Sequence, residues 1–340
     1  MTVTTMLPPD ALVLVTAANG LVASHVVDRL LEAGFRVRGT VRDLNKNKWM
    51  VSLFQTRYGP DRLALIEVPN PLAPNAWDAS VKDVSGIAHV FGATDIYTQD
   101  YEQAVAAELP AHISLLEAAV QEPRMKAFVF TSSAWAAYTP MANNKTKVDE
   151  WTWNSTAIHL ASSSDGDAEL KFFANYMALK TVLEQRIWAY IRSRRFPYTC
   201  NSILLATVIG NTLQPRELGM PSTAGMVKWV YDGENNQILA AMQPQWCVDT
   251  RDAALLYVAA LTTLSVNQER LFAFGDRYSW FKVAQILEEM FPAREIMSIP
   301  DRGWDQTQVC NQRAELLLKS MGQGGWTTLE ESVKAGSECF

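Results

Sequence analysis

The segment Ala11-Leu12-Val13-Leu14-Val15-Thr16 runs directly into Ala17-Ala18-Asn19-Gly20-Leu21-Val22-Ala23-Ser24. The first segment has the apolar pattern of a buried parallel strand. The second consists mostly of small residues, and a helical pattern continues from it to Leu31. A strand, a small-residue turn and a helix N-terminus in this order can hold a pyrophosphate, because the first N–H groups of a helix have no partner within the helix.

Strand-like and helical segments alternate through the first two thirds of the chain. Such alternation predicts an α/β fold with a right-handed, doubly wound parallel sheet. The predicted strands cover residues 11–16, 36–40, 63–68, 86–90, 127–131 and 198–205.

One of these strands ends in hydroxyl groups. The stretch Lys126-Ala127-Phe128-Val129-Phe130 leads into Thr131-Ser132-Ser133-Ala134. Ligands of open α/β sheets bind at the carboxyl ends of the strands. We therefore expect these hydroxyls to lie near a binding or catalytic site.

Tyr176 and Lys180 are four residues apart in a segment with a helical pattern. On a helix this spacing places the phenol and the ammonium on one face, where the cation favours the phenolate and lowers a pKa that starts near ~10. Such a tyrosine can exchange protons at neutral pH. Taken alone, the pair also fits a half-buried aromatic ring above a surface lysine, which is the commoner case.

Composition excludes several classes of protein. The 340 residues are 48% hydrophobic and carry a net charge of −6, so neither a nucleic acid nor an anionic membrane is an expected partner. The four cysteines have no metal-ligand spacing, and we predict no metal site. No secretory signal or membrane-spanning apolar run is present in the sequence, which predicts a cytoplasmic protein.

Together these features resemble the extended short-chain dehydrogenase/reductase family, in particular its dihydroflavonol reductase-like branch with the yeast-type NADPH-dependent aldehyde and carbonyl reductases. The resemblance covers nearly the whole chain. Besides the motifs above, it rests on Val37-Arg38-Gly39-Thr40-Val41-Arg42, Gly86-Ile87-Ala88-His89, Val248-Asp249-Thr250-Arg251-Asp252 and Gly325-Trp326-Thr327-Thr328-Leu329-Glu330-Glu331-Ser332.

The resemblance implies two domains and a small-molecule substrate. A Rossmann dinucleotide-binding domain would comprise residues 1–210 and 245–275. A smaller, discontinuous substrate-binding cap would comprise residues 211–244 and 276–340. We expect a monomer or a homodimer.

The family's phosphate turn, Gly-x-x-Gly-x-x-Gly, reads Ala17-x-x-Gly20-x-x-Ala23 here. The third position needs only a small residue, but the first often needs a backbone shape that a methyl group resists. Asn70 also replaces the usual aspartate near the adenine, and Leu205 replaces the usual proline at the nicotinamide end. The cofactor-binding residues implied are Thr16, Ala17, Asn19, Gly20, Leu21, Val22, Arg42, Lys48, Asn70, Tyr176, Lys180 and Leu205.

The residue after the second strand predicts which nucleotide binds. An NAD enzyme presents an acidic side chain to the ribose at this point, whereas this chain presents Arg42, with Lys46 and Lys48 close behind. A guanidinium suits a 2′-phosphate, so NADP(H) is the predicted cofactor. The alternative is that these are solvated charges at the start of a helix, and Asp43 lies beside them.

By the same resemblance, Ser133, Tyr176 and Lys180 are the predicted catalytic residues. Ser133 would hydrogen-bond the substrate oxygen, with Ser132 as the neighbouring alternative. Tyr176 would deliver a proton, and Lys180 would lower the pKa of Tyr176 and hold the nicotinamide ribose. Aromatic residues near these groups favour a bulky, apolar substrate. The predicted substrate-lining residues are Trp135, Phe172, Ala206 and Trp246.

Two other interpretations remain. A non-redox cyclase, isomerase or dehydratase could keep Tyr176 and Lys180 for proton transfer, and the substitutions at Ala17, Asn70 and Leu205 favour it because all three fall on the nucleotide side. A protein that binds NADP(H) without turnover would not need the three catalytic residues. For His89, at the end of a strand, and His112, in a helix, a core or surface role is expected rather than catalysis.

Overall fold

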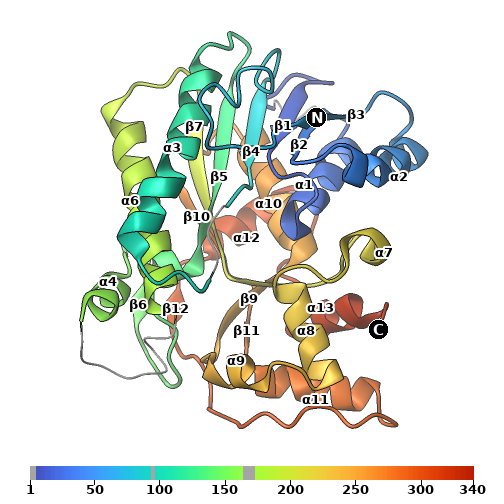
Figure 1. Cartoon of the computed structure of the whole chain (residues 1–340), viewed down its shortest axis with the longest axis vertical. Helices are drawn as coiled ribbons and strands as arrows, with labels where there is room; N and C mark the ends of the chain where they lie inside the picture. Colours follow the sequence, from blue (N-terminus) through green and yellow to red (C-terminus); the bar gives the residue numbers. More distant parts are fainter. Residues whose placement is uncertain (1–4, 93–95, 164–172) are drawn as a thin grey trace. The chain divides into compact units, whose positions relative to one another are not determined.

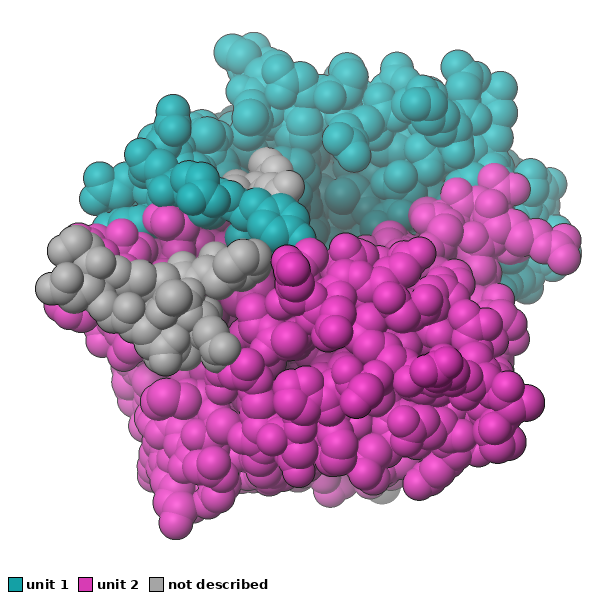
Figure 2. Space-filling model, turned by 60° about the horizontal axis from the view of Figure 1, so that its bottom comes forward, with its two compact units in different colours: residues 1–132, 182–203, 254–270 teal, residues 133–181, 204–253, 271–340 magenta. Residues whose placement is uncertain are grey.

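The computed structural model describes residues 5–92, 96–163 and 173–340. The chain forms two compact units, coloured separately in Figure 2. Unit 1 contains residues 1–132, 182–203 and 254–270, and unit 2 contains residues 133–181, 204–253 and 271–340.

A mostly parallel, seven-stranded sheet flanked by helices is the main architectural feature (Figure 1). The strand order is β10-β7-β5-β4-β1-β2-β3. Its strands are β1 (Leu12–Val15), β2 (Arg36–Val41), β3 (Leu63–Glu67), β4 (Gly86–His89), β5 (Ala127–Ser133), β7 (Thr199–Leu205) and β10 (Arg270–Ala273). The pairs β1–β2, β2–β3, β1–β4 and β4–β5 are parallel.

The sheet forms because its strands are apolar enough to be buried on both faces. All four residues of β4 and the last three of β1 are buried. The neighbouring helices are α1 (Leu21–Glu32), α2 (Lys48–Tyr58), α3 (Tyr101–Val120), α6 (Ala174–Ser193) and α10 (Thr250–Thr262). Helix α1 buries Ala23, Val26, Val27 and Leu30, whose spacing of three and four residues defines one apolar face.

The direction in which successive strands are added to the sheet reverses at β1. The chain moves from β1 outward to β2 and β3, then returns to place β4 on the other side of β1. Open α/β sheets bind ligands at such a switch point, beyond the carboxyl ends of the strands. Here those ends lead to Thr16 after β1 and Val90 after β4.

Unit 2 contains two smaller sheets. Strand β9 (Gln245–Asp249) pairs parallel with β8 (Thr207–Ile209) and antiparallel with β11 (Asp276–Tyr278). Strand β6 (Lys147–Val148) pairs parallel with β12 (Gln308–Val309). The helices of this unit are α4 (Ser155–Ser162), α7 (Pro215–Leu218), α8 (Thr223–Asp232), α9 (Asn236–Ala241), α11 (Trp280–Met290), α12 (Gln312–Ser320) and α13 (Leu329–Ser337), and short 3-10 turns cover Asn45–Asn47 (η1, in unit 1) and Ala134–Ala136 (η2).

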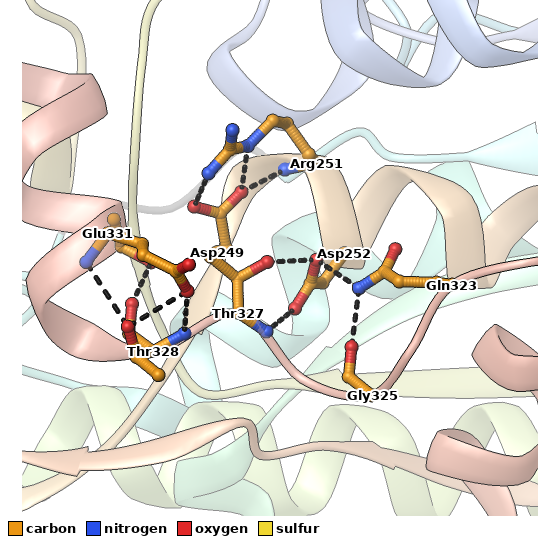
Figure 3. Close-up of polar contacts among 9 residues, drawn as sticks. Asp249, Arg251, Asp252, Gln323, Gly325, Thr327, Thr328 and Glu331 are labelled. Atoms are coloured by element: carbon orange, nitrogen blue, oxygen red, sulfur yellow. Dashed lines mark hydrogen bonds and ion pairs between the residues drawn. The ribbon is translucent and has the colours of Figure 1, made fainter.

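The loop before α13 is fastened to the start of α10 through Asp252 (Figure 3). The two carboxylate oxygens of Asp252 accept the hydroxyl of Thr327 at 2.8 Å, the N–H of Thr327 at 2.7 Å and the amide of Gln323 at 2.8 Å. Thr328 then caps α13 in a capping box with Glu331. Two motifs that lie far apart in the sequence are thus joined.

The α/β fold class with a doubly wound parallel sheet is confirmed. Each of the six predicted strands is present within two residues of its predicted bounds. The seventh strand, β10, is not among the predicted strands. The compact units have other bounds than the predicted domains, with residues 133–181 in unit 2, and the division into a dinucleotide-binding domain and a cap stays a prediction. Among the described residues, no helix has the length and apolar character of a membrane span.

Candidate active site

Tyr176 and Lys180 lie on one face of the first turns of α6, in unit 2. The Nζ atom of Lys180 is 5.2 Å from the centroid of the Tyr176 ring. Both residues are half-buried. The local geometry expected from the spacing is therefore present.

Ser133 ends β5 and is also in unit 2. Its hydroxyl oxygen accepts the N–H of Trp135 at 3.2 Å, which orients the first turn after the strand. The alternative, Ser132, is buried, and its hydroxyl has no hydrogen-bond partner among the residues that the structure describes.

Trp135 connects this turn to Tyr176. The two rings meet edge to face, with centroids 5.8 Å apart and planes at 83°. The indole N–H of Trp135 donates to Oε1 of Gln245 at 2.7 Å, and its carbonyl oxygen accepts the side-chain amide of Asn154 at 2.8 Å. Because the indole and the backbone carbonyl of Trp135 are both hydrogen-bonded, the indole is held in place beside the phenol of Tyr176.

A narrow hollow adjoins Trp135 within unit 2. It is small, with room for about one water molecule, and it is partly open to solvent. Its lining is mostly apolar and comprises Trp135, Pro140, Phe173, Met177, Ala241, Met242, Gln243 and Gln245. Met177, Met242 and Gln245 are not among the predicted substrate-lining residues. Phe173 directly precedes α6 and its carbonyl accepts the N–H of Met177 at 2.9 Å, but no local pattern connects Gln245 with them.

Tyr138, another phenol of unit 2, is a poor proton donor by comparison. It is fully buried and donates to Oδ2 of Asp305 at 3.0 Å. Burial, and then the nearby carboxyl group of Asp305, raise the pKa of Tyr138 well above its ordinary value. Its role is to hold the loop that carries Asp305.

The predicted phosphate turn, in unit 1, has a strained residue at its first position. Ala17 has φ of 51°, in the left-handed region that favours glycine. Its N–H donates to the hydroxyl oxygen of Thr40 at 3.0 Å, and its carbonyl accepts the N–H of Gly20 at 2.8 Å. The turn also packs tightly on β2, because a Cβ atom on Gly39 would lie 2.7 Å from that of Ala18. Ala17 thus holds a left-handed backbone at the first position of the turn despite its methyl group.

The other predicted residues of this turn differ in exposure. Thr16 and Leu21 are buried, whereas Asn19, Gly20 and Val22 are half-buried. A ligand would therefore meet mainly the backbone N–H groups that begin α1, as expected for phosphate binding.

Three predicted contacts with the far end of the nucleotide lie after β2 (Arg42, Lys48) and after β3 (Asn70). Arg42 and Lys48 are exposed. Asp43 is held in its own turn, where Oδ1 accepts the N–H groups of Asn45 at 2.9 Å and Lys46 at 3.2 Å. Asn70 is exposed, and its Oδ1 accepts the N–H of Leu72 at 3.0 Å. The role of Arg42 and Lys48 in binding a phosphate stays a prediction.

The remaining predicted residues lie in unit 2 or outside the described part of the chain. Leu205 ends β7 and is half-buried, and the following Ala206 is buried. Trp246 is buried in β9, where the guanidinium carbon of Arg277 lies 4.3 Å from its ring centroid. Phe172 lies outside the described residues.

Comparison with known proteins identifies the family. The NAD dependent epimerase/dehydratase family model matches residues 13–270. Aldehyde reductase 2 of Sporidiobolus salmonicolor is 32% identical over 98% of this chain and 97% of its own length. Ketoreductase adrE of Penicillium rubens is 35% identical over 97% of each chain. The crystal structure of Gre2 from Candida albicans in complex with NADPH has a TM-score of 0.79 at 20% identity, covering 96% of this chain and 97% of that one.

The chain belongs to the NAD dependent epimerase/dehydratase family, which is the extended short-chain dehydrogenase/reductase group. The predicted family and enzyme class, an oxidoreductase that works with a nicotinamide nucleotide, are confirmed.

Proposed function

We propose that this enzyme uses NADPH to reduce a bulky, apolar ketone or aldehyde to the alcohol. The observation that carries the proposal is Tyr176, which shares a helix face with Lys180 and meets the ring of Trp135 edge to face. Trp135 also lines the apolar hollow. A proton donor beside an apolar wall suits a hydrophobic carbonyl compound.

The residues of unit 1 fit a phosphorylated dinucleotide. The half-buried Ala17 and Gly20 lie in the turn that precedes the first N–H groups of α1. The exposed Arg42, beside an aspartate that is already held by its own turn, supports a 2′-phosphate and hence NADP(H). The NADPH complex of the structurally similar Gre2 supports the same cofactor.

The proposed reaction forms a C–H bond at the carbonyl carbon and an O–H bond at its oxygen while the C=O π bond breaks. When bound, NADPH supplies the hydride. Ser133 hydrogen-bonds the substrate oxygen, and Tyr176 gives it a proton. Lys180 stabilises the phenolate left on Tyr176, and a proton from solvent restores the phenol.

The test uses NADPH deuterated at C4 with a panel of aryl ketones and aldehydes that differ in bulk. We expect one equivalent of NADPH to be consumed for each alcohol formed, with deuterium on the carbinol carbon. The enzyme's preference for a carbonyl compound should rise with the apolar bulk of that compound. Reduction of small polar carbonyl compounds alone would contradict the substrate class.

A non-redox epimerase or dehydratase activity is the second candidate, favoured by the strained Ala17 on the nucleotide side. Such an enzyme would convert its substrate without net consumption of NADPH and without deuterium in the product. Product formed at full rate by nucleotide-free protein would overturn the reductase proposal. A cytoplasmic location and a monomeric or homodimeric state stay predictions.

A further inference from the structure

Four buried polar side chains of unit 1 form a hydrogen-bonded chain that the proposed chemistry does not use. Thr16 Oγ1 lies 3.0 Å from His89 Nδ1, and His89 Nε2 lies 2.9 Å from His112 Nδ1. His112 Nε2 lies 3.4 Å from Oε1 of Glu108. None of the four residues is more than 3% exposed. The chain connects the ends of β1 and β4 to α3.

The backbone after β4 decides the direction of the first hydrogen bond. The N–H groups of Val90 and Phe91 both donate to Thr16 Oγ1, at 3.0 and 3.1 Å. A hydroxyl oxygen has two lone pairs and one hydrogen. Because both lone pairs of Thr16 are used, its hydrogen must be donated to Nδ1 of His89.

The remaining proton positions follow in sequence. His89 accepts at Nδ1, so its own proton is on Nε2 and is donated to Nδ1 of His112. His112 must then carry its proton on Nε2, which points to Glu108. A second proton on either ring would set two hydrogen-bond donors against each other. Both histidines are therefore neutral in this arrangement.

The surroundings of His89 favour the neutral form. The rings of Trp77, Phe91 and Phe128 lie within 6.0 Å of its ring, measured between centroids, and its carbonyl accepts the hydroxyl of Thr131 at 3.0 Å. Burial, and then the neighbouring His112, lower the pKa of His89 well below its ordinary value, although Glu108 acts in the opposite direction. Tyr257, from α10, bonds to Thr131 at 2.6 Å, and its own pKa is raised by burial.

We propose that His89 and His112 are positioning residues that act through Thr16 to hold the turn of residues 16–20 and residues 90–91 in the arrangement that binds the nucleotide. This inference rests on the proposed NADPH-dependent function. Thr16 directly precedes Ala17, whose left-handed backbone persists only if its surroundings determine it. Thr16 supplies that restraint at the carboxyl ends of two adjacent strands.

The first test reads the proton positions directly. The chain has only four histidines, so single His→Phe substitutions assign each ring in a nitrogen-15 spectrum of protein labelled at the histidine rings. We expect His89 and His112 to show a protonated Nε2 and an unprotonated Nδ1 near neutral pH. A protonated Nδ1 on either residue would overturn the deduced chain.

The second test measures NADPH affinity by fluorescence titration. Thr16→Val keeps the side-chain shape but leaves two N–H groups without an acceptor, so we expect the Kd to rise about tenfold. Thr16→Ser retains the hydroxyl and should restore most of the lost affinity. Thr56→Val, which removes an exposed hydroxyl in α2, is the matched control and should bind as the unmodified protein does.

His112→Phe decides the question if Thr16→Val does not fold. It keeps a ring but removes the acceptor for His89, and we expect a smaller rise in Kd, about threefold. Unchanged affinity in a folded Thr16→Val or His112→Phe variant would contradict positioning by this chain. Failure of the unmodified protein to bind NADPH would instead contradict the proposed function, while the nitrogen-15 spectrum still decides the proton positions.

Discussion

The indole of Trp135 and the phenol of Tyr176 meet edge to face, with ring centroids 5.8 Å apart. The positive edge of one aromatic ring favours the negative face of another, so the contact restricts the phenol as well as forming a wall. Lys180 lies on the same helix face, 5.2 Å from the ring centroid. We propose Tyr176 as the proton donor, and its phenol is thus oriented by Trp135, which follows β5, and by Lys180 on the same helix.

Replacing Tyr176 with Phe should reduce the rate of carbonyl reduction by roughly 10²–10⁴-fold, because it removes the general acid while keeping the ring contact with Trp135. NADPH affinity and thermal stability should change little. Steady-state kinetics measure the rate, NADPH titration measures the affinity, and thermal unfolding measures the stability. Tyr231→Phe, in α8, is the control and should retain normal activity. If Tyr176→Phe kept more than half of the rate, Tyr176 would not be the proton donor.

Replacing Ala17 with Gly should stabilise the protein, because a non-glycine residue at φ of 51° is strained. The left-handed backbone costs about 1–2 kcal/mol, and glycine loses about 0.5–1 kcal/mol through its freer unfolded chain. A net gain of about 0.5–1 kcal/mol is expected in urea unfolding.

Ala33→Gly is the matched control for that change. Ala33 has an ordinary φ of −73° at the end of α1, so glycine should destabilise the protein there. Equal losses of stability at both positions would show that the turn tolerates its alanine without strain. A tighter Kd for NADPH in Ala17→Gly would further show that the methyl group hinders binding.

Replacing Arg42 with Ala should weaken NADPH binding more than NADH binding. One charge-assisted hydrogen bond to the 2′-phosphate contributes roughly 1.5–3 kcal/mol, or about 10–150-fold in Kd. Titrations with both nucleotides measure the difference. Arg195→Ala, another exposed arginine of unit 1, should leave both affinities unchanged. The same loss for both nucleotides would remove Arg42 from 2′-phosphate recognition.

Because His89 is buried, we expect the folded protein to lose stability on mild acidification. Burial lowers its folded-state pKa, so the unfolded chain binds a proton first as pH falls through about 6.5. Below that pH the unfolded state holds more protons than the folded state, so the free energy of unfolding falls by up to ~1.4 kcal/mol per pH unit. Above that pH, the contribution of His89 to stability is fully present.

Unfolding free energies measured between about pH 7.5 and about pH 5.5 test this sign. His89→Phe should show a flatter dependence on pH even if it is less stable at every pH. His159→Phe, at an exposed position in α4, should keep the slope of the unmodified protein. Parallel slopes for all three proteins would exclude His89 as the source.

Replacing Asp252 with Asn should destabilise unit 2. The amide would present a donor where Thr327 and Gln323 also donate (Figure 3). A buried donor left unsatisfied costs about 1–3 kcal/mol. Urea unfolding should show that loss, and an unchanged midpoint would mean that the loop is held by its other contacts.

The sequence was sufficient for the features that depend on local spacing. Apolar segments of strand length placed six of the seven sheet strands, and the spacing of Tyr176 and Lys180 placed both on one helix face. Such features are predictable because the repeat of a helix or strand fixes the direction of each side chain. The positive φ of Ala17 agrees with the strain expected of a non-glycine residue at the first position of the turn.

The tertiary structure alone decided which distant side chains meet. Trp135 is fastened by Gln245, 110 positions later, and Thr16 is connected to His89, 73 positions later. No local pattern specifies such pairs, because they depend on strand order and on how side chains pack once the backbone is closed. The sequence therefore determined the fold class and the helix face that carries Tyr176, while packing between distant segments determined the wall beside that tyrosine and the buried histidine chain.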